Sequence, residues 1–262
     1  MRRQLFVVSL LTLALAGVSS CAGREPGDVN APPVPPGIDP FCSTRPGLGF
    51  CEDFDVAELP GGLDEVVEDG GTASRGPDAV SPPHALQVVT DDVDTATVGL
   101  RKTFGPGIKH RLFTQMRVDD VSGGFDDDAS ADIAAIEFAS DTAEGWRVGY
   151  RVDADGVFSA FAQKDSDVEP TIFPITQTIE PGVFTSVRLD VIFNDELAPP
   201  GACPGLGAFL LGRFRDETII DCVPLDPPDT AATSTLALGL TSRGGGVWAA
   251  AYDNLTFDVH TE

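Results

Sequence analysis

Runs in which apolar and polar residues alternate recur along the chain from residue 41 to its end. Neighbouring side chains of a strand point to opposite faces, so each run predicts a strand with one buried face. In the run 146–152, Arg147 and Arg151 fall on one face and the apolar side chains fall on the other. The predicted strands cover residues 84–90, 97–104, 111–118, 146–152, 157–163, 184–193, 208–214, 218–223, 236–240 and 247–259.

Turn residues separate these runs. Asp155-Gly156 lies between two of them and predicts a hairpin, because glycine accepts the positive φ that tight turns need. Residues 215–217 predict a second hairpin. Residues 129–139 fit a helix or a strand, and we favour the strand because Ile133, Ile136 and Phe138 lie in β-rich surroundings.

The strand series predicts an all-β fold, an antiparallel two-sheet sandwich or barrel of about a dozen strands. No linker interrupts it, so residues 41–262 are expected to form one domain. No fixed repeat is visible, which argues against a propeller or a solenoid.

The first 20 residues have the features of a secretion signal. Two arginines precede an apolar segment, residues 5–18, that is too short to cross a membrane as a helix. The segment leads to Ser19-Ser20-Cys21, which resembles the bacterial lipobox, whose cysteine is lipidated and becomes the N-terminus. We expect residues 1–20 to be a lipoprotein signal peptide and Cys21 to carry the lipid. The alternative is cleavage nearby that leaves Cys21 as a free thiol.

The cysteine count fits this interpretation. The chain has five cysteines, and an odd number in an exported protein needs an explanation. With Cys21 used as the anchor, four remain, which suit two disulfides in an oxidising compartment. Three pairings are open, and we favour the local one, Cys42–Cys51 with Cys203–Cys222. A zinc site is the competing use, and no C-x-x-C spacing supports it.

Residues 21–40 hold the lipidated cysteine and a proline-rich tether that has no core to form. The formal net charge of the chain is −24, which argues against nucleic acid as a partner. So acidic a protein needs a lipid to hold it to a membrane. Ala22, after the cysteine, favours export to the outer membrane of the cell envelope.

Three segments carry a resemblance to a known family. They are Phe50-Cys-Glu-Asp-Phe-Asp55, Ser81-Pro-Pro-His-Ala-Leu-Gln-Val88 and Ala251-Tyr-Asp-Asn-Leu-Thr-Phe-Asp-Val259. Their order over residues 41–262 is similar to that of concanavalin A-like lectin/glucanase jelly rolls, including the laminin-G-like ones. The arrangement also resembles small cell-surface lipoproteins of the myxobacterial type. The resemblance implies a concanavalin A-like, antiparallel two-sheet jelly-roll sandwich and says little of function.

The catalytic patterns of related enzymes are missing from the sequence. Glycoside hydrolases of this family carry paired Glu residues on one strand, whereas Glu137 is the only acid in 133–139 and Asp132 is expected on the opposite face. Polysaccharide lyases with a similar fold need a Tyr or His base beside an Arg or Gln. Here the three His and two Tyr are scattered, and no Gln-x-His segment occurs.

The resemblance also implies a structural Ca²⁺ between the opening acidic segment and the closing strand. Carried over, its ligands would be Asp53 or Asp55 together with Asp253. Alternation places Asp253 on the apolar face, where a carboxylate must be paired, hydrogen-bonded or bound to a cation. The alternative is that Asp253 caps a strand end through backbone amides.

Sugar binding needs aromatic platforms beside polar groups. Trp248 and Tyr252 share a strand face with Asn254, and outward-facing arginines are expected to join them if their strands adjoin. These are Arg117, Arg147 and Arg151. We therefore expect a non-catalytic surface lipoprotein that recognises a polysaccharide or an envelope protein. A carbohydrate-active enzyme with an atypical site and a purely structural envelope module are the alternatives.

Overall fold

The computed structural model is a β-sandwich of two antiparallel sheets. It describes residues 40–43, 49–55, 58–81, 83–119, 122–139, 144–178, 180–193, 209–214, 217–224 and 232–261. The helix α1 (Pro40–Ser43) is short. Within these ranges no helix has the length and apolar character needed to cross a membrane.

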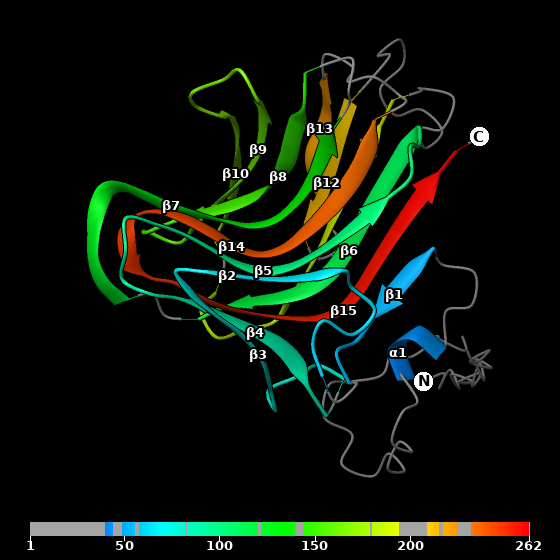
Figure 1. The fold of residues 1–262 in the computed structure, drawn as a ribbon. Coiled ribbons are helices and arrows are strands. Elements are labelled where there is room, and N and C mark those ends of the chain that lie inside the picture. The colour runs from blue at the N-terminus through cyan, green and yellow to red at the C-terminus, as the bar shows by residue number, and fades with distance from the viewer. Residues whose placement is uncertain are drawn as a thin grey trace, which may run out of the picture. The chain divides into compact units, whose positions relative to one another are not determined.

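The first sheet, called sheet A, has the strand order β13-β12-β11-β6-β15-β4-β3, with β1 also paired to β15 (Figure 1). Its strands are β1 (Phe50–Glu52), β3 (Gly71–Gly76), β4 (Ala85–Thr90), β6 (Lys109–Val118), β11 (Thr185–Ile192), β12 (Phe209–Phe214), β13 (Glu217–Pro224) and β15 (Ala249–His260).

The second sheet, called sheet B, has the order β10-β9-β8-β7-β14-β5-β2. Its strands are β2 (Glu65–Asp69), β5 (Thr95–Phe104), β7 (Ser122–Ala139), β8 (Trp146–Asp153), β9 (Val157–Lys164), β10 (Thr171–Thr178) and β14 (Thr233–Val247). Strands β7 and β14 bend into an arc whose hollow side is turned away from β15 of sheet A (Figure 1). The outer face of sheet B is therefore concave.

The core lies between the sheets and is filled from both by the alternating apolar positions. Leu112 and Met116 of β6 and Leu236 and Leu238 of β14 are among its buried side chains. The sequence prediction of an all-β, antiparallel jelly-roll sandwich is confirmed. The segment 129–139, which fitted a helix or a strand, is the end of β7.

Both predicted hairpins are present. Strands β8 and β9 pair antiparallel across a turn in which Gly156 has φ 76°. Strands β12 and β13 pair in the same way. The predicted adjacency of the first and last strands is confirmed as well, because Phe50 of β1 is paired with Phe257 of β15.

A disulfide joins Cys42 of α1 to Cys51 of β1, as predicted. It ties the helix to the edge of the β1–β15 pair. Of the second predicted disulfide, Cys203–Cys222, Cys203 lies outside the described residues, and so do the signal peptide, Cys21 and nearly all of the tether.

Candidate functional site

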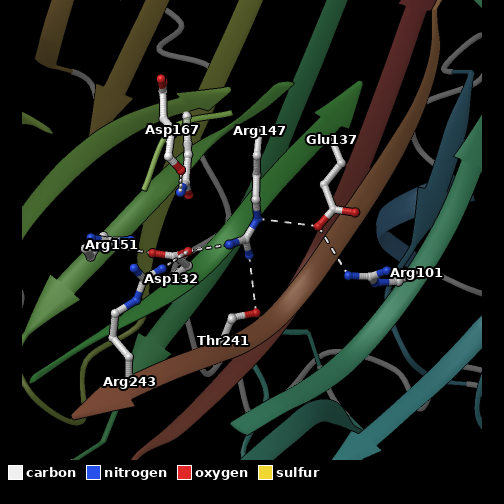
Figure 2. A network of polar contacts seen from close by, with 9 residues as sticks. Arg101, Asp132, Glu137, Arg147, Arg151, Asp167, Thr241 and Arg243 are labelled. Carbon is white, nitrogen blue, oxygen red and sulfur yellow. Dashed lines mark hydrogen bonds and ion pairs between the residues drawn. The ribbon is translucent and has the colours of Figure 1, made fainter. Parts of the chain in front are cut away.

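A network of charged side chains lies on the concave face of sheet B. Arg147 and Arg151 come from β8, where alternation turns them away from the core, and Asp132 comes from the neighbouring β7. The other members are Arg101 of β5, Glu137 of β7, and Thr241 and Arg243 of β14 (Figure 2). Five of these seven residues were not expected at the site from the sequence.

Asp132 is the centre of this network. Its side chain is 1% exposed, and its two oxygens lie 2.5 Å from Nη1 of Arg147 and 2.6 Å from Nε of Arg151. Nη2 of Arg243 approaches to 3.7 Å. A buried carboxylate with several guanidinium partners fixes their positions, because charge-assisted hydrogen bonds of this kind are strong and directional.

Arg147 joins the two carboxylates of the site. Besides Asp132, its guanidinium contacts Glu137 at 3.4 Å and donates to Oγ1 of Thr241 at 3.3 Å (Figure 2). Glu137 in turn accepts a hydrogen bond from Arg101 at 3.2 Å. The chain of contacts therefore runs across four neighbouring strands, from β8 to β5.

The expectation that Asp132 and Glu137 lie on opposite faces is wrong. A β-bulge between Asp132 and Ala134 shifts the register of β7 against β8 by one residue. Both carboxylates consequently reach the concave face, where Arg147 contacts each of them. No signal in the sequence marked this bulge.

Phe161 of β9 supports the two central arginines. Its ring is fully buried, and the guanidinium carbons of Arg147 and Arg151 lie 5.4 and 5.2 Å from its centroid. Such cation–π contacts hold flat guanidinium groups against an aromatic surface. The two arginines are thus held by a ring and a carboxylate together.

Small residues form the floor beside this network. Gly99 of β5 is paired with Gly239 of β14, and a Cβ on either would lie 2.2–2.3 Å from a backbone carbonyl oxygen. Around them is a small hollow of about 20 Å³, which is room for about one water molecule. Arg101, Asp132 and Arg147 are among its lining residues. The hollow is therefore a shallow dent beside the guanidinium groups and not a deep pocket.

The charge balance of the site contrasts with that of the chain. Four guanidinium groups face the carboxylates of Asp132 and Glu137. Two further acidic residues lie at the border of the site, Asp167 (Figure 2) and Glu65, which is paired across the strands with Arg101. The chain as a whole has 17 basic and 41 acidic residues, so the four arginines are concentrated here, and guanidinium groups favour an anion as ligand.

The predicted aromatic platform is not on the surface. Trp248 and Tyr252 have no exposed area, and both belong to the core. Asn254 is 3% exposed and its amide nitrogen donates to the side chain of Gln115. These three residues therefore do not line a sugar-binding surface. Strand alternation assigns side chains to two faces of a sheet, but it does not show which of the two faces is buried.

The structure separates the three predicted arginines. Arg147 and Arg151 meet on sheet B, whereas Arg117 belongs to β6 of sheet A. There its guanidinium pairs with Asp119 at 2.7 Å and lies 5.2 Å from the ring centroid of Phe184. Arg117 is therefore not part of the concave site.

The candidate calcium ligands lie near one another but differ in their partners. Asp253 is fully buried, and its oxygens accept hydrogen bonds from the backbone nitrogens of Ser81 and Asn254, both at 2.7 Å. This is the capping role named as the alternative.

Burial raises the pKa of Asp253 to about 7. Burial, with repulsion from Asp53, also raises the pKa of Asp55 to about 7.

The opening acidic segment fits a cation better than Asp253 does. One buried oxygen of Asp53 and one of Asp55 have no hydrogen-bond partner, and neither does Nδ1 of His84. The guanidinium of Arg75 is attracted by both carboxylates and supplies some positive charge. Within the described ranges, no group of three or more His, Cys, Asp or Glu side chains is arranged to hold a metal ion.

The usual bases of polysaccharide lyases are not at the concave site. Both tyrosines of the chain, Tyr150 and Tyr252, are fully buried in the core. His110 is also buried, beside Phe138, and burial lowers its pKa to about 4. His84 lies next to Asp55, and His260 ends β15 on sheet A.

Solved structures with the same fold include carbohydrate-active enzymes. An endo-beta-1,4-glucuronan lyase from the fungus Trichoderma reesei matches with a TM-score of 0.56 and 13% identity, covering 81% of this chain and 95% of that one. The alginate lyase vAL-1 from a Chlorella virus matches with a TM-score of 0.56 and 9% identity, covering 81% of this chain and 100% of that one.

The cellulose-induced protein Cip1 has a TM-score of 0.54 and 13% identity, and the match covers 81% of this chain and 100% of that one. The protein therefore has the jelly-roll β-sandwich that also serves polysaccharide lyases. Identities this low establish the fold alone. No protein-family model matches the sequence, and no curated protein does.

Proposed function

We propose that the protein binds an acidic polysaccharide on the concave face of sheet B without cleaving it. The observation that carries the proposal is the network around Asp132, which holds Arg147 and Arg151 in place in a shallow hollow. Guanidinium groups recognise carboxylates and sulfates with paired hydrogen bonds. Arg101 and Arg243 are about one third exposed and are the cations that a ligand reaches first.

The arrangement of the charged groups supports binding over catalysis. A lyase needs a base beside the cation that neutralises the uronate, and neither a tyrosine nor a histidine lies in the network. A glycoside hydrolase needs two carboxylates that flank the sugar bond. Here Arg147 lies between Asp132 and Glu137 and contacts both, so no glycosidic oxygen fits between them.

The sequence supports a place at the cell envelope. We propose that Cys21 is lipidated, that residues 21–40 tether the domain, and that Cys203 pairs with Cys222. The Cys42–Cys51 disulfide agrees with export to an oxidising compartment. On this view the lipid holds the protein to the outer membrane, and the domain reaches a polysaccharide outside it.

A bound Ca²⁺ is a separate proposal. The unpartnered oxygens of Asp53 and Asp55 would hold the ion, and such hard oxygen ligands are those that calcium prefers. The ion would neutralise the carboxylates that join β1 to the rest of sheet A. It lies apart from the concave face and takes no part in ligand binding.

Calorimetry and an ultraviolet assay for unsaturated uronates test the function together. We expect polyglucuronate and alginate to bind, neutral dextran not to bind, and no unsaturated product to form. Arg101→Gln with Arg243→Gln should weaken binding about tenfold, since each loses a charged contact. Lys102→Gln is the matched control, because Lys102 pairs with Asp64 away from the network.

Two results would reject the proposal. Product formation from either polymer would establish a lyase, and shorter chains without unsaturated ends would establish a hydrolase. Binding that is equal in the Arg101/Arg243 double variant and in Lys102→Gln would place the ligand elsewhere on the molecule.

A further inference from the structure

The concave face of sheet B has an apolar side next to its charged network. Three of the six large apolar side chains that are exposed within the described ranges lie on β9, on β10 or in the turn between them. Val157 at the start of β9 is 46% exposed, Ile172 of β10 is 41% exposed, and Val168 of the turn is 89% exposed. Exposed apolar side chains that gather in one place are typical of a binding surface, whereas scattered ones are not.

Strand register places two of these side chains on the concave face, together with the exposed Pro174. Ile172 is paired across the strands with Phe161 of β9, and Pro174 is paired with Ser159. Directly opposite residues of an antiparallel pair share one face, and Phe161 lies against the guanidinium groups of the concave side. Val157 follows the same alternation as Ser159 and Phe161. Val157, Ile172 and Pro174 therefore form an apolar strip on the concave face.

The apolar strip is continuous with the arginine network. Arg151 of β8 is paired across the strands with Ser159, whose partner on the other side is Pro174. The guanidinium carbon of Arg151 lies 5.2 Å from the ring centroid of Phe161, which is the partner of Ile172. Neighbouring strands lie about 4.8 Å apart, so the backbone of β10 lies about 10 Å from that of β8. One ligand of a few sugar units can therefore contact both the strip and the arginines.

Strand β10 is at the edge of sheet B, and Pro174 limits what can pair with it. Proline has no backbone N–H, and in edge strands it acts against pairing with another chain. Strand addition by a second copy of the protein is therefore disfavoured at β10. The apolar strip is left to contact a ligand that lies on the concave face.

Five acidic residues lie at the two ends of β9, in the segments that connect it to β8 and β10. They are Asp153, Asp155, Asp165, Asp167 and Glu169. Asp153 and Asp167 accept hydrogen bonds from backbone nitrogens of these segments, and the other three are exposed. The carboxylates of an acidic polysaccharide are repelled by these groups and attracted by the arginines of β8. An uncharged, apolar substituent of the same polymer is therefore what fits the strip.

We infer that the polysaccharide bound on the concave face carries acetyl esters, and that their methyl groups pack on Val157, Ile172 and Pro174. This inference rests on the proposed function for the acidic polymer itself. Aliphatic side chains suit a methyl group, whereas a sugar ring packs best on an aromatic surface, and no aromatic side chain described on β9 or β10 is exposed. The carboxylates of the polymer hold it to the arginines, and the esters add to the affinity.

Calorimetry with two forms of one polymer tests the acetyl group alone. Partly acetylated polyglucuronate is compared with unmodified polyglucuronate from the same batch. The full chain should bind the acetylated form about fourfold more tightly, the gain from burying one methyl group. Val157→Ser with Ile172→Ser should remove this difference. Val89→Ser is the matched control and should keep it, because Val89 is 40% exposed on β4 of sheet A. Circular dichroism shows whether each variant is folded.

The possible failures can be told apart. Equal affinity of the full chain for the two forms would overturn the acetyl inference and leave the proposed function standing. So would a preference that persists in the Val157/Ile172 variant, or one that Val89→Ser also removes. No binding of either form would overturn the proposed function and the inference with it. Sedimentation of the full chain as a dimer that the Val157/Ile172 variant no longer forms would show that a second copy covers the strip, and would overturn the inference as well.

Discussion

The hydroxyl of Tyr252 on β15 crosses the core and lies 2.6 Å from the carbonyl oxygen of Ile133 on β7. The same hydroxyl lies 2.9 Å from the carbonyl oxygen of Gly239 on β14. Ile133 lies at the bulge of β7, and Gly239 lies where the pairing of β14 with β7 shifts register. The bulge in β7 is the one that turns Asp132 onto the concave face. A buried residue of sheet A thus supports the site on sheet B.

Replacing Tyr252 with Phe should therefore affect both stability and binding. The change removes the single buried hydroxyl proton that is donated toward these carbonyls, with the shorter distance to Ile133, and the free energy of unfolding should fall by about 1–3 kcal/mol. Because the bulge positions Asp132, affinity for polyglucuronate should fall as well. Urea unfolding and calorimetry on the same preparation measure the two effects.

Tyr150→Phe is the matched control for Tyr252→Phe. Tyr150 lies on sheet B, and its hydroxyl donates to the carbonyl oxygen of Arg188 on sheet A at 2.6 Å. Its loss should destabilise the fold by a similar amount but leave binding at the concave face unchanged. Equal losses of affinity in the two variants would show that general loosening, and not the bulge, weakens binding.

The buried carboxylates predict an unusual dependence of stability on pH. The pKa of Asp55 is raised to about 7, whereas a carboxyl in the unfolded chain has a pKa near 3.8. Between these values the native state holds more protons, so stability falls as pH rises from about 4 to about 7. In the presence of a chelator, Asp55→Asn should be more stable than the parent at pH 8 and equally stable below pH 4.

The difference between Asp55→Asn and the parent reports on Asp55 and on its interaction with Asp53. His110 acts in the opposite sense, because its lowered pKa of about 4 destabilises the fold as pH falls below 6.5. That contribution is the same in both proteins and cancels. A constant stability difference across the whole range would exclude the proposed titration of Asp55.

Calcium should raise the stability of the parent more at pH 8 than at pH 5, since the ligands must be ionised to bind it. Thermal unfolding with and without millimolar Ca²⁺ measures this effect. Asp53→Asn should remove the response. Mg²⁺ at the same concentration is the control, and an equal shift with both ions would indicate general screening of acidic charge in place of a site.

Loss of the Cys42–Cys51 disulfide should destabilise the domain by roughly 3 kcal/mol, because the bond closes a short loop in the unfolded chain. Denaturation of the Cys42→Ser/Cys51→Ser variant measures this value. Mass spectrometry of the unreduced parent tests the Cys203–Cys222 pair.

Much of the fold was predictable from alternation. The inward faces of β6 and of residues 236–240 in β14 follow the sequence pattern directly, because buried and less buried positions alternate along them. The turn at Gly156 was predicted from turn chemistry, which depends on local sequence. The pairing of β1 with β15 joins the two ends of the domain, and its prediction came from the resemblance.

The site was less predictable because bulges interrupt the alternation. At Asn254, where φ is 53°, a bulge in β15 lets Tyr252 and Leu255 both face the core. Counting alternate residues across this position assigned Asp253 to the wrong face of β15. In the same way, the bulge in β7 made the prediction put Asp132 and Glu137 on opposite faces. Arg147 and Arg151 were placed correctly on an outer face, but their partner Asp132 lies at a bulge, and Thr241 and Arg243 come from β14, which is distant in sequence.

The link between α1 and β1 determines how the domain responds to a pull. Tension applied to the chain before Pro40 passes through Cys42 to Cys51 without unwinding the residues between them. It then loads the β1–β15 pairing at Cys51, whose partner is Thr256. Because β15 is an interior strand of sheet A, with β6 and β4 on either side, the load spreads into the whole sheet. Force that enters the domain at its N-terminal end is therefore borne by the hydrogen bonds of sheet A together and not by β1 alone.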